Sequence, residues 1–147
     1  MPKREAPAVG FHFALEFDGK IQAYFTECSG LGSEHEVTEA QAGAEGGPEA
    51  IIKIPGRLKW ENITLKRGIS NNKVPWDWRK QVIDGDVTGA RKNGSIVMYD
   101  RKGKETARWN FRRAWPVKVS ISQIKSDGNE TISEELTITH EYIERVN

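Results

Sequence analysis

The sequence contains too few cysteines and histidines for a disulfide framework or a clear metal site. Cys28 is the only cysteine, so no disulfide can form within one chain. The three histidines, His12, His35 and His140, lie far apart along the chain. The two glutamates that flank His35 would point to the opposite face of a strand. The sequence therefore predicts no disulfide and no metal site.

Long apolar runs are also missing. No segment approaches the ~20 apolar residues that a membrane-spanning helix needs. The first ten residues, MPKREAPAVG, lack the apolar centre of a signal peptide. These absences predict a soluble protein that folds in a reducing cytoplasm and carries no membrane anchor.

Common catalytic and cofactor-binding motifs are absent as well. Gly30–Gly32 lacks the third glycine and the following helix of a dinucleotide-binding loop, and the sequence has no phosphate-binding P-loop. The net charge of +1 gives no general attraction to nucleic acid. The sequence thus predicts no catalytic residue, no cofactor and no enzyme. A small hydrolase that uses a pair of carboxylates remains an alternative.

Charge is distributed unevenly along the chain. Residues 21–52 contain six glutamates and no lysine or arginine, whereas residues 53–118 contain seventeen basic residues against six acidic ones. Residues 119–147 are acidic again, with six acidic residues against two basic ones. This pattern can reflect pairing within one subunit or complementarity between copies of the chain.

Most of the sequence shows the two-residue alternation of β-strands. Phe11–Glu27 predicts a hairpin that turns at Asp18-Gly19. One helix is predicted from Val74 to Gly85, because a proline and an aspartate occupy its first turn and a glycine its end. Further strands are predicted within residues 52–70, 94–111, 115–124 and 131–147. About eight strands and one flanking helix indicate one mainly β domain over residues 1–147, a small antiparallel barrel or sandwich.

Three segments carry more specific expectations. Thr38–Ala50 is acidic, glycine-rich and without an apolar face, so a long loop is predicted over about residues 38–50. Leu58 and Trp60 before Glu61-Asn62 occupy even positions, whereas the apolar residues after it occupy odd positions. A bulge at Glu61-Asn62 would bring both sets to the same face of one strand. Pro116 has no N–H group and is predicted to lie at the start of a strand or on a sheet edge.

The segment ARWNFRRAW, Ala107–Trp115, interleaves aromatic and basic residues. Such a mixture can form a surface that stacks on bases, so a stand-alone nucleic-acid-binding β-barrel is one alternative. In a strand, however, Trp109 and Phe111 share one face while Arg108 and Arg112 share the other, which favours packing in a core. The residues predicted to pack in the core or along the helix are Trp60, Trp78, Val82, Trp109, Phe111 and Trp115.

Several blocks of the sequence together resemble one family. They are PGRLKWENITLKRGIS, NGSIVMYDRKGKETARWNFRRAWPVKVS, the C-terminal EELTITHEYIERV, and an opening FALEFDG that is followed by FTECSGL. In order and spacing, from about Phe11 to Val146, they are similar to the inner tube protein of contractile phage tails and of phage-derived contractile injection systems. A tube-initiating or baseplate-adaptor variant of the same family is an alternative.

The resemblance implies a structural subunit without enzymatic activity. Subunits of this family form hexameric rings that stack into a hollow tube, and strands of each subunit line a continuous lumen with the helix outside. The implied partners are further copies of the chain, a contractile sheath protein, baseplate and tube-terminating proteins, and a cargo or tape-measure protein in the lumen. The implied location is the cytoplasm during assembly and later a phage tail or an extracellular injection particle.

Two sets of residues are expected at the assembly surfaces. The C-terminal strand is expected to bury the face with Leu136, Ile138 and Tyr142 and to turn its polar face to the lumen. An ordinary solvated surface is the alternative for this polar face. The lumen-facing candidates are Ser133, Glu135, Thr137, Thr139 and Glu141. The acidic segment is expected to reach a basic surface on a subunit of the next ring. The inter-ring candidates are Glu34, Glu36, Glu39, Glu45 and Glu49.

Overall fold

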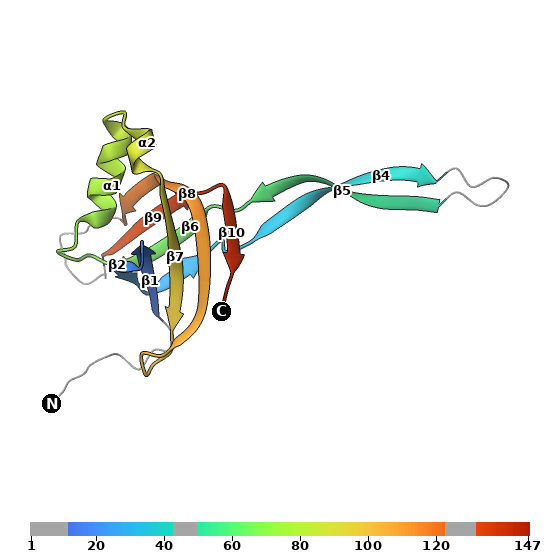
Figure 1. Cartoon of the computed structure of the whole chain (residues 1–147). Helices are drawn as coiled ribbons and strands as arrows, with labels where there is room; N and C mark the ends of the chain where they lie inside the picture. The colour runs from blue at the N-terminus through green and yellow to red at the C-terminus, as the bar shows by residue number, and fades with distance from the viewer. Residues whose placement is uncertain (1–11, 43–49, 123–131) are drawn as a thin grey trace.

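A computed structural model describes residues 12–42, 50–122 and 132–147. It shows a compact β body, two helices at one end of that body, and a long two-stranded arm that projects to the side (Figure 1). The strands are β1 (His12–Phe17), β2 (Lys20–Phe25), β3 (Glu27–Ser29), β4 (Ser33–Ala42), β5 (Ala50–Trp60), β6 (Ile63–Gly68), β7 (Lys92–Tyr99), β8 (Glu105–Ile121), β9 (Ser133–Thr139) and β10 (Tyr142–Arg145). The helices are α1 (Val74–Ile83) and α2 (Val87–Ala90).

The body is one antiparallel sheet of eight strands that rolls around a core. Its order is β2-β1-β7-β8-β9-β6-β3, and β10 pairs with the first half of β8. The two end strands, β2 and β3, are consecutive in the chain and are joined by Thr26, whose N–H donates to the carbonyl of Lys66 on β6 over 2.8 Å. One continuous segment therefore pairs with β1 through its first half and with β6 through its second half.

The predicted first hairpin is confirmed. Asp18 and Gly19 connect β1 to β2 with φ values of 53° and 78°. Both residues adopt the left-handed backbone conformation that a two-residue hairpin turn requires. Aspartate and glycine tolerate this conformation better than most other residues.

The predicted helix is also confirmed as α1. Pro75 lies in its first turn, and Gly85 follows its end with a φ of 99°. The short helix α2 was not expected, because the sequence prediction ended at Gly85. Asp86 caps α2 by accepting a hydrogen bond from the N–H of Gly89 over 3.0 Å.

The loop predicted over Thr38–Ala50 is wrong at both of its ends. Strand β4 continues to Ala42 and β5 begins at Ala50, and these strands form the arm. Backbone hydrogen bonds between β4 and β5 form this hairpin, although its side chains bury almost no surface within the subunit. The prediction was wrong because it required a strand here to have an apolar face of its own. The bulge expected at Glu61-Asn62 is not found. The chain leaves the two-stranded sheet of the arm there and enters the sheet of the body.

Two expectations about the second half of the chain are also corrected. Pro116 lies inside the continuous strand β8, so the predicted strand start is wrong, whereas the predicted edge position holds on the β7 side. The register between β8 and β9 shifts between Pro116 and Lys118, and β7 stops pairing at Ala114, so Pro116 removes no ladder hydrogen bond on the β7 side. Arg79 of α1 donates to the carbonyl of Pro116 over 3.4 Å.

The C-terminal segment is two strands instead of one. Strand β9 ends at Thr139, and the chain crosses over to pair β10 with β8. In β9 the even-numbered residues are buried, but after the crossing the odd-numbered Ile143 is buried instead. Tyr142 therefore does not share the buried face of Leu136. Glu141 lies in the crossing and not on the polar face of β9, and its carboxylate pairs with Arg113 at 3.0 Å.

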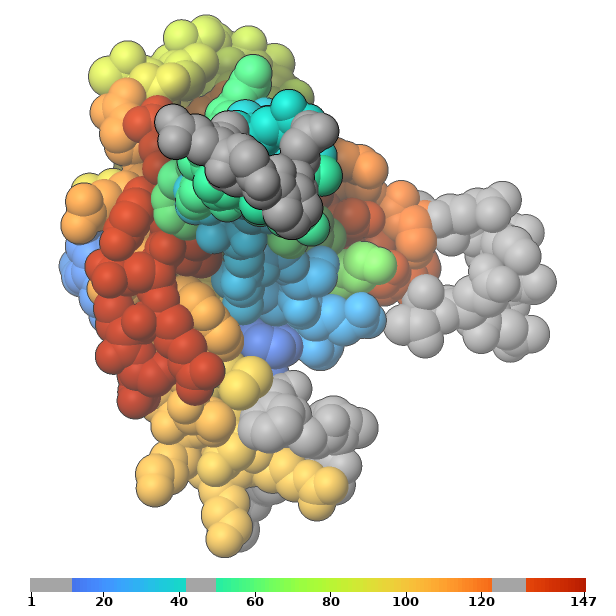
Figure 2. Space-filling view, turned by 90° about the vertical axis from the view of Figure 1, so that its right-hand side faces the viewer, coloured from blue at the N-terminus to red at the C-terminus, as the bar shows by residue number. Residues whose placement is uncertain are grey.

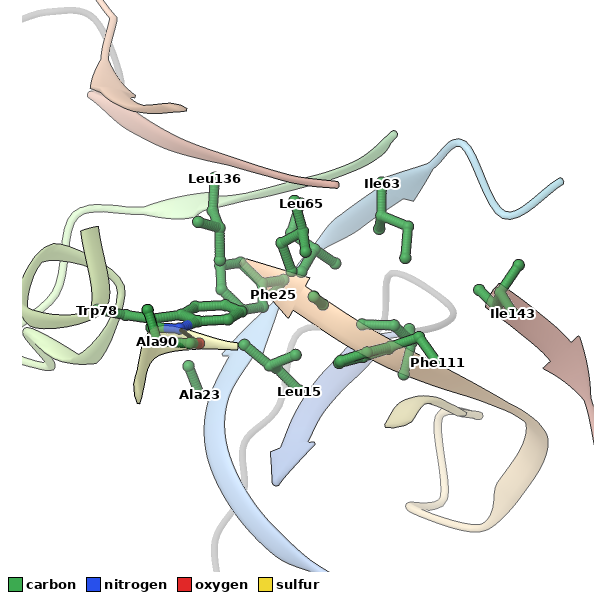
Figure 3. Close-up of a cluster of buried hydrophobic side chains, with 13 residues drawn as sticks. Leu15, Ala23, Phe25, Ile63, Leu65, Trp78, Ala90, Phe111, Leu136 and Ile143 are labelled. Carbon is green, nitrogen blue, oxygen red and sulfur yellow. Dashed lines mark hydrogen bonds between the residues drawn. The ribbon is translucent and has the colours of Figure 1, made fainter. Parts of the chain in front are cut away.

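Apolar side chains from the rolled sheet and from α1 meet in a single core (Figure 3). Trp78 reaches it from α1, and its indole N–H donates to the carbonyl of Ala90 over 2.6 Å. The ring of Trp78 also meets the ring of Phe17 edge-on, with the centroids 4.9 Å apart. The helix therefore closes one end of the body by inserting a large aromatic side chain.

Candidate assembly surfaces

The described residues offer little for catalysis. Among residues 12–42, 50–122 and 132–147, no three His, Cys, Asp or Glu side chains are grouped so that they could hold a metal ion. Within the same ranges no helix has the length and apolar character needed to cross a bilayer. Burial raises the pKa of the Cys28 thiol to about 12, so this cysteine is a poor nucleophile near neutral pH. The candidate sites are surfaces instead.

The arm is the largest feature that the body does not cover. Ten residues of β4 extend it by about 33 Å at ~3.3 Å per residue. Its two faces differ in character. One face of the outer half is apolar apart from a single threonine, and it consists of Thr38, Ala40, Ala42, Ala50, Ile52 and Ile54. Ile52 and Ile54 expose 47% and 45% of their surface, so this face lacks a partner within the described subunit.

The acidic residues of the arm lie opposite lysines of the same arm. Glu34 is the cross-strand partner of Lys59, and Glu39 is the cross-strand partner of Lys53. Directly opposite side chains in a sheet have Cβ atoms about 5 Å apart, so opposite charges there attract each other. Glu36 differs, because it lies at the register shift between His35 and Val37. Part of the segregated charge is therefore balanced within one subunit.

An aromatic cluster fixes the root of the arm to the body. The ring of Trp60, the last residue of β5, lies 5.8 Å from the ring of His140 and 5.4 Å from that of Tyr142. Nε2 of His140 lies 3.0 Å from the carbonyl oxygen of Glu61. Burial lowers the pKa of His140, which keeps its ring neutral at pH 7. The arm therefore leaves the body at a defined place.

The outward face of β9 is polar and partly exposed. Four of the lumen candidates alternate along it: Ser133, Glu135, Thr137 and Thr139. The neighbouring strands continue this face, because Lys66 of β6 lies opposite Glu135 and also opposite Glu27 of β3. The result is a surface of hydroxyl groups and alternating charges that spans three strands.

Beneath this surface lies a buried ion pair that the sequence did not reveal. Arg67 and Glu134 approach to 2.9 Å, with side chains only 6% and 1% exposed. The guanidinium of Arg67 also donates to the carbonyl of Asn72 and lies 5.4 Å from the centroid of Phe25. Asn72 in turn donates to the carbonyl of Gln22 over 2.8 Å. This network joins β6, β9, β2 and the segment before α1.

The residues predicted to pack together lie close to the core. Trp78 and Phe111 are buried, and Trp60, Val82 and Trp109 pack against the buried cluster. Trp115 is half-buried in β8 beside Thr139. Phe111 in the core is not available to stack on bases. Glu34, Glu36 and Glu39 are exposed on β4, whereas Glu45 and Glu49 lie outside the described residues.

Comparison with known proteins places these surfaces in context. Residues 9–144 match the sequence model of a family described as T4-like virus tail tube protein gp19. The fold resembles a chain in the cryo-EM structure of the PVC sheath/tube terminator of an extracellular contractile injection system in the extended state. That match has 20% identity and a TM-score of 0.70, and it covers 99% of each chain.

Two further solved structures show the same fold. A chain of the anti-feeding prophage baseplate, 6-fold symmetrised, has 16% identity and a TM-score of 0.71, with 99% of this chain and 98% of that chain covered. Hcp1 from Salmonella typhimurium has 14% identity and a TM-score of 0.60, with 93% and 86% covered. No curated protein sequence matches the chain.

Proposed function

Because this chain belongs to the T4-like virus tail tube protein family and is a structural subunit of a contractile tail tube, we propose that it forms hexameric rings that stack into a hollow tube. The observation that carries this proposal is the arm, whose apolar face has no cover within the described subunit. A two-stranded hairpin is at best marginally stable alone, so the arm needs a neighbour. A sheath around the tube, a baseplate, a terminating protein and a cargo or tape-measure protein inside complete the proposed assembly.

We propose that the arm docks on a neighbouring subunit mainly through its apolar face. This face supplies hydrophobic contact, whereas Glu34 and Glu39 already have lysines opposite them. Glu36, at the register shift, is the arm glutamate best placed to meet a basic surface of another ring. Apolar contact resists salt, and exposed ion pairs do not.

Ile52→Asp combined with Ile54→Asp is expected to leave a folded body but to prevent tubes from forming. The two carboxylates would lie on the face proposed to be buried, where an unpaired charge is costly. Electron microscopy and analytical ultracentrifugation would measure the assembly, and circular dichroism would check the fold. Ile51→Asp with Val37→Asp, on the other face of the arm, is the matched control. Tubes of normal length from the first variant would contradict docking through the apolar face.

Charge on the arm can be tested separately. Glu34→Lys with Glu36→Lys and Glu39→Lys is expected to shorten tubes, more at low salt than at 1 M salt, where the Debye length is about 3 Å. Adding Lys59→Glu and Lys53→Glu to this triple variant exchanges the charges of both pairs, restores attraction within the arm and keeps Glu36→Lys. If the exchanges restore full length, the effect belongs to the hairpin itself, and the proposed charged contact between rings is wrong.

We also propose that the polar face of β9 and its neighbours lines the lumen. Its hydroxyl groups and alternating charges suit contact with water and passing cargo, and they carry no strong field of one sign. Ser133, Glu135, Thr137 and Thr139 are the lining residues from β9. Glu141 lies at the crossing to β10 and would mark one margin of this face.

Thr139→Cys in a Cys28→Ala background is expected to react with small thiol reagents in assembled tubes but not with reagents too large to enter the open ends. Ile83→Cys on α1, where the native side chain is 67% exposed, serves as the exterior control. Mass spectrometry after labelling would measure both. Equal labelling of the cysteine at position 139 by both reagent sizes would place this face of β9 outside the lumen.

A further inference from the structure

The turn between β7 and β8 presents a group of exposed cations at one end of the molecule. Arg101, Lys102 and Lys104 are exposed there. Asp100 holds the turn, because its Oδ1 accepts hydrogen bonds from the N–H groups of Lys102 and Lys104, each over 2.9 Å. These bonds lower the pKa of Asp100 and hold its Oδ1 within the turn. Figure 2 shows this end of the molecule as a projection at the bottom, far from the helices at the top.

A polar recess lies at the other end of β7, beside residues 110–112 of β8. Its volume is about 300 Å³, and its described lining includes the carboxylates of Asp18 and Glu144 and one guanidinium, that of Arg112. Arg112 is already held over the ring of Tyr142, 4.8 Å from its centroid. The amide side chains of Asn93 and Asn110 add polar groups. The recess therefore favours a cation. Its volume is similar to that of the smallest ligand pockets and is large enough for one long side chain.

The turn of one subunit cannot reach its own recess. Asp18 follows Phe17, which pairs with Gly94 in β7, and the turn begins after Tyr99. Tyr99 lies five residue positions beyond Gly94 in β7, which is about 17 Å at ~3.3 Å per residue. The basic turn and the recess thus occupy separate places along one pair of strands.

We propose that the β7–β8 turn of one subunit docks in this recess of a second copy in the adjacent ring, with Arg101, Lys102 or Lys104 placed between Asp18 and Glu144. This inference rests on the proposed stacking of rings. Rings that stack head to tail need both halves of the axial contact on one chain, at opposite ends. The turn and the recess lie at the two ends of β7, and their charges are opposite, as such a contact requires. The contact repeats once per subunit, so weak pairs add up along each ring.

Reversing the turn with Arg101→Glu, Lys102→Glu and Lys104→Glu is expected to leave rings intact and to shorten the mean tube length by roughly fivefold or more at 0.15 M salt, where the Debye length is about 8 Å. Adding Asp18→Lys and Glu144→Lys should restore at least half of the original length. Lys73→Glu with Lys80→Glu, also exposed but outside both sites, is the control and should leave length unchanged. Normal tubes from the reversed turn, or no rescue by the reversed recess, would overturn the proposal.

A cysteine pair tests the contact directly. Lys102→Cys with Asp18→Cys in a Cys28→Ala background should give, after mild oxidation of tubes, a ladder of disulfide-linked subunits that extends beyond six. Either cysteine alone should give no ladder, and the distance along the strands excludes a disulfide within one chain. A tube-forming double variant without a ladder would contradict the docking. If the unmodified chain forms no rings, the proposed function itself fails, which is a different result.

Discussion

Glu134→Ala is expected to lower the free energy of unfolding by about 3–5 kcal/mol, because it leaves the buried Arg67 guanidinium without its partner. Both side chains are almost fully enclosed, so water cannot replace the lost carboxylate. Arg67 would retain the carbonyl of Asn72, but a carbonyl does not neutralise its charge. Urea unfolding followed by tryptophan fluorescence, carried out on unassembled protein, would measure the change.

The neighbouring Glu135→Ala is the control, because Glu135 lies on the partly exposed face of β9 and should change stability by less than about 1 kcal/mol. Arg67→Met with Glu134→Leu removes both charges together and is expected to cost less than Glu134→Ala alone. If Glu134→Ala and Glu135→Ala cost the same, the ion pair is not buried in solution and this account of the β6–β9 region is wrong.

Trp78→Ala is expected to cost about 3–5 kcal/mol, because it removes the aromatic side chain with which α1 closes the body. It also leaves the carbonyl of Ala90 without its indole donor. Trp78→Phe keeps most of the packing and loses only the hydrogen bond, so it should cost less, about 1–3 kcal/mol. Thermal and urea unfolding of the two variants would separate packing from hydrogen bonding.

Trp76→Ala on the same helix is the matched control. Trp76 is 36% exposed, whereas Trp78 is 4% exposed. Its loss should therefore cost less than Trp78→Ala. A loss below about 1 kcal/mol for Trp78→Ala would mean that the helix does not pack on the sheet in solution.

Local signals in the sequence identified the elements whose structure depends on neighbouring residues. Asp18-Gly19 predicts its hairpin because few residue pairs accept two left-handed conformations in succession. The first turn with Pro75 and the glycine at position 85 likewise define α1. The mainly antiparallel β class follows from the two-residue alternation of the strands.

Features that depend on distant parts of the chain were not predictable. The sequence predicts a loop over Thr38–Ala50 because this segment has no apolar face of its own, and only pairing across the hairpin brings Thr38 and Ala40 beside Ile54 and Ile52. The alternation through Thr139, His140 and Glu141 looks continuous, although the chain changes partner strand there. Glu134 falls among polar residues, and only the fold brings it to Arg67.

The candidate surfaces were predictable to different degrees. The polar alternation from Ser133 to Thr139 is visible in the sequence and survives as one face of β9. The pairing of Glu39 with Lys53 depends on the register of the arm, which the sequence left open between internal and intermolecular complementarity. The recess between Asp18 and Glu144 joins residues from distant strands, so no sequence signal could have indicated it.

Negative-stain electron microscopy of the purified full chain, combined with light scattering across a range of protein concentrations, tests the central claim most directly. End-on views would show the symmetry of each ring, and side views would show whether the rings stack. Single rings that never stack would favour a variant at the end of the tube over the main subunit. The account predicts six-fold hollow rings that stack into tubes whose length grows with protein concentration. A monodisperse monomer, with neither rings nor tubes at any concentration, would contradict it.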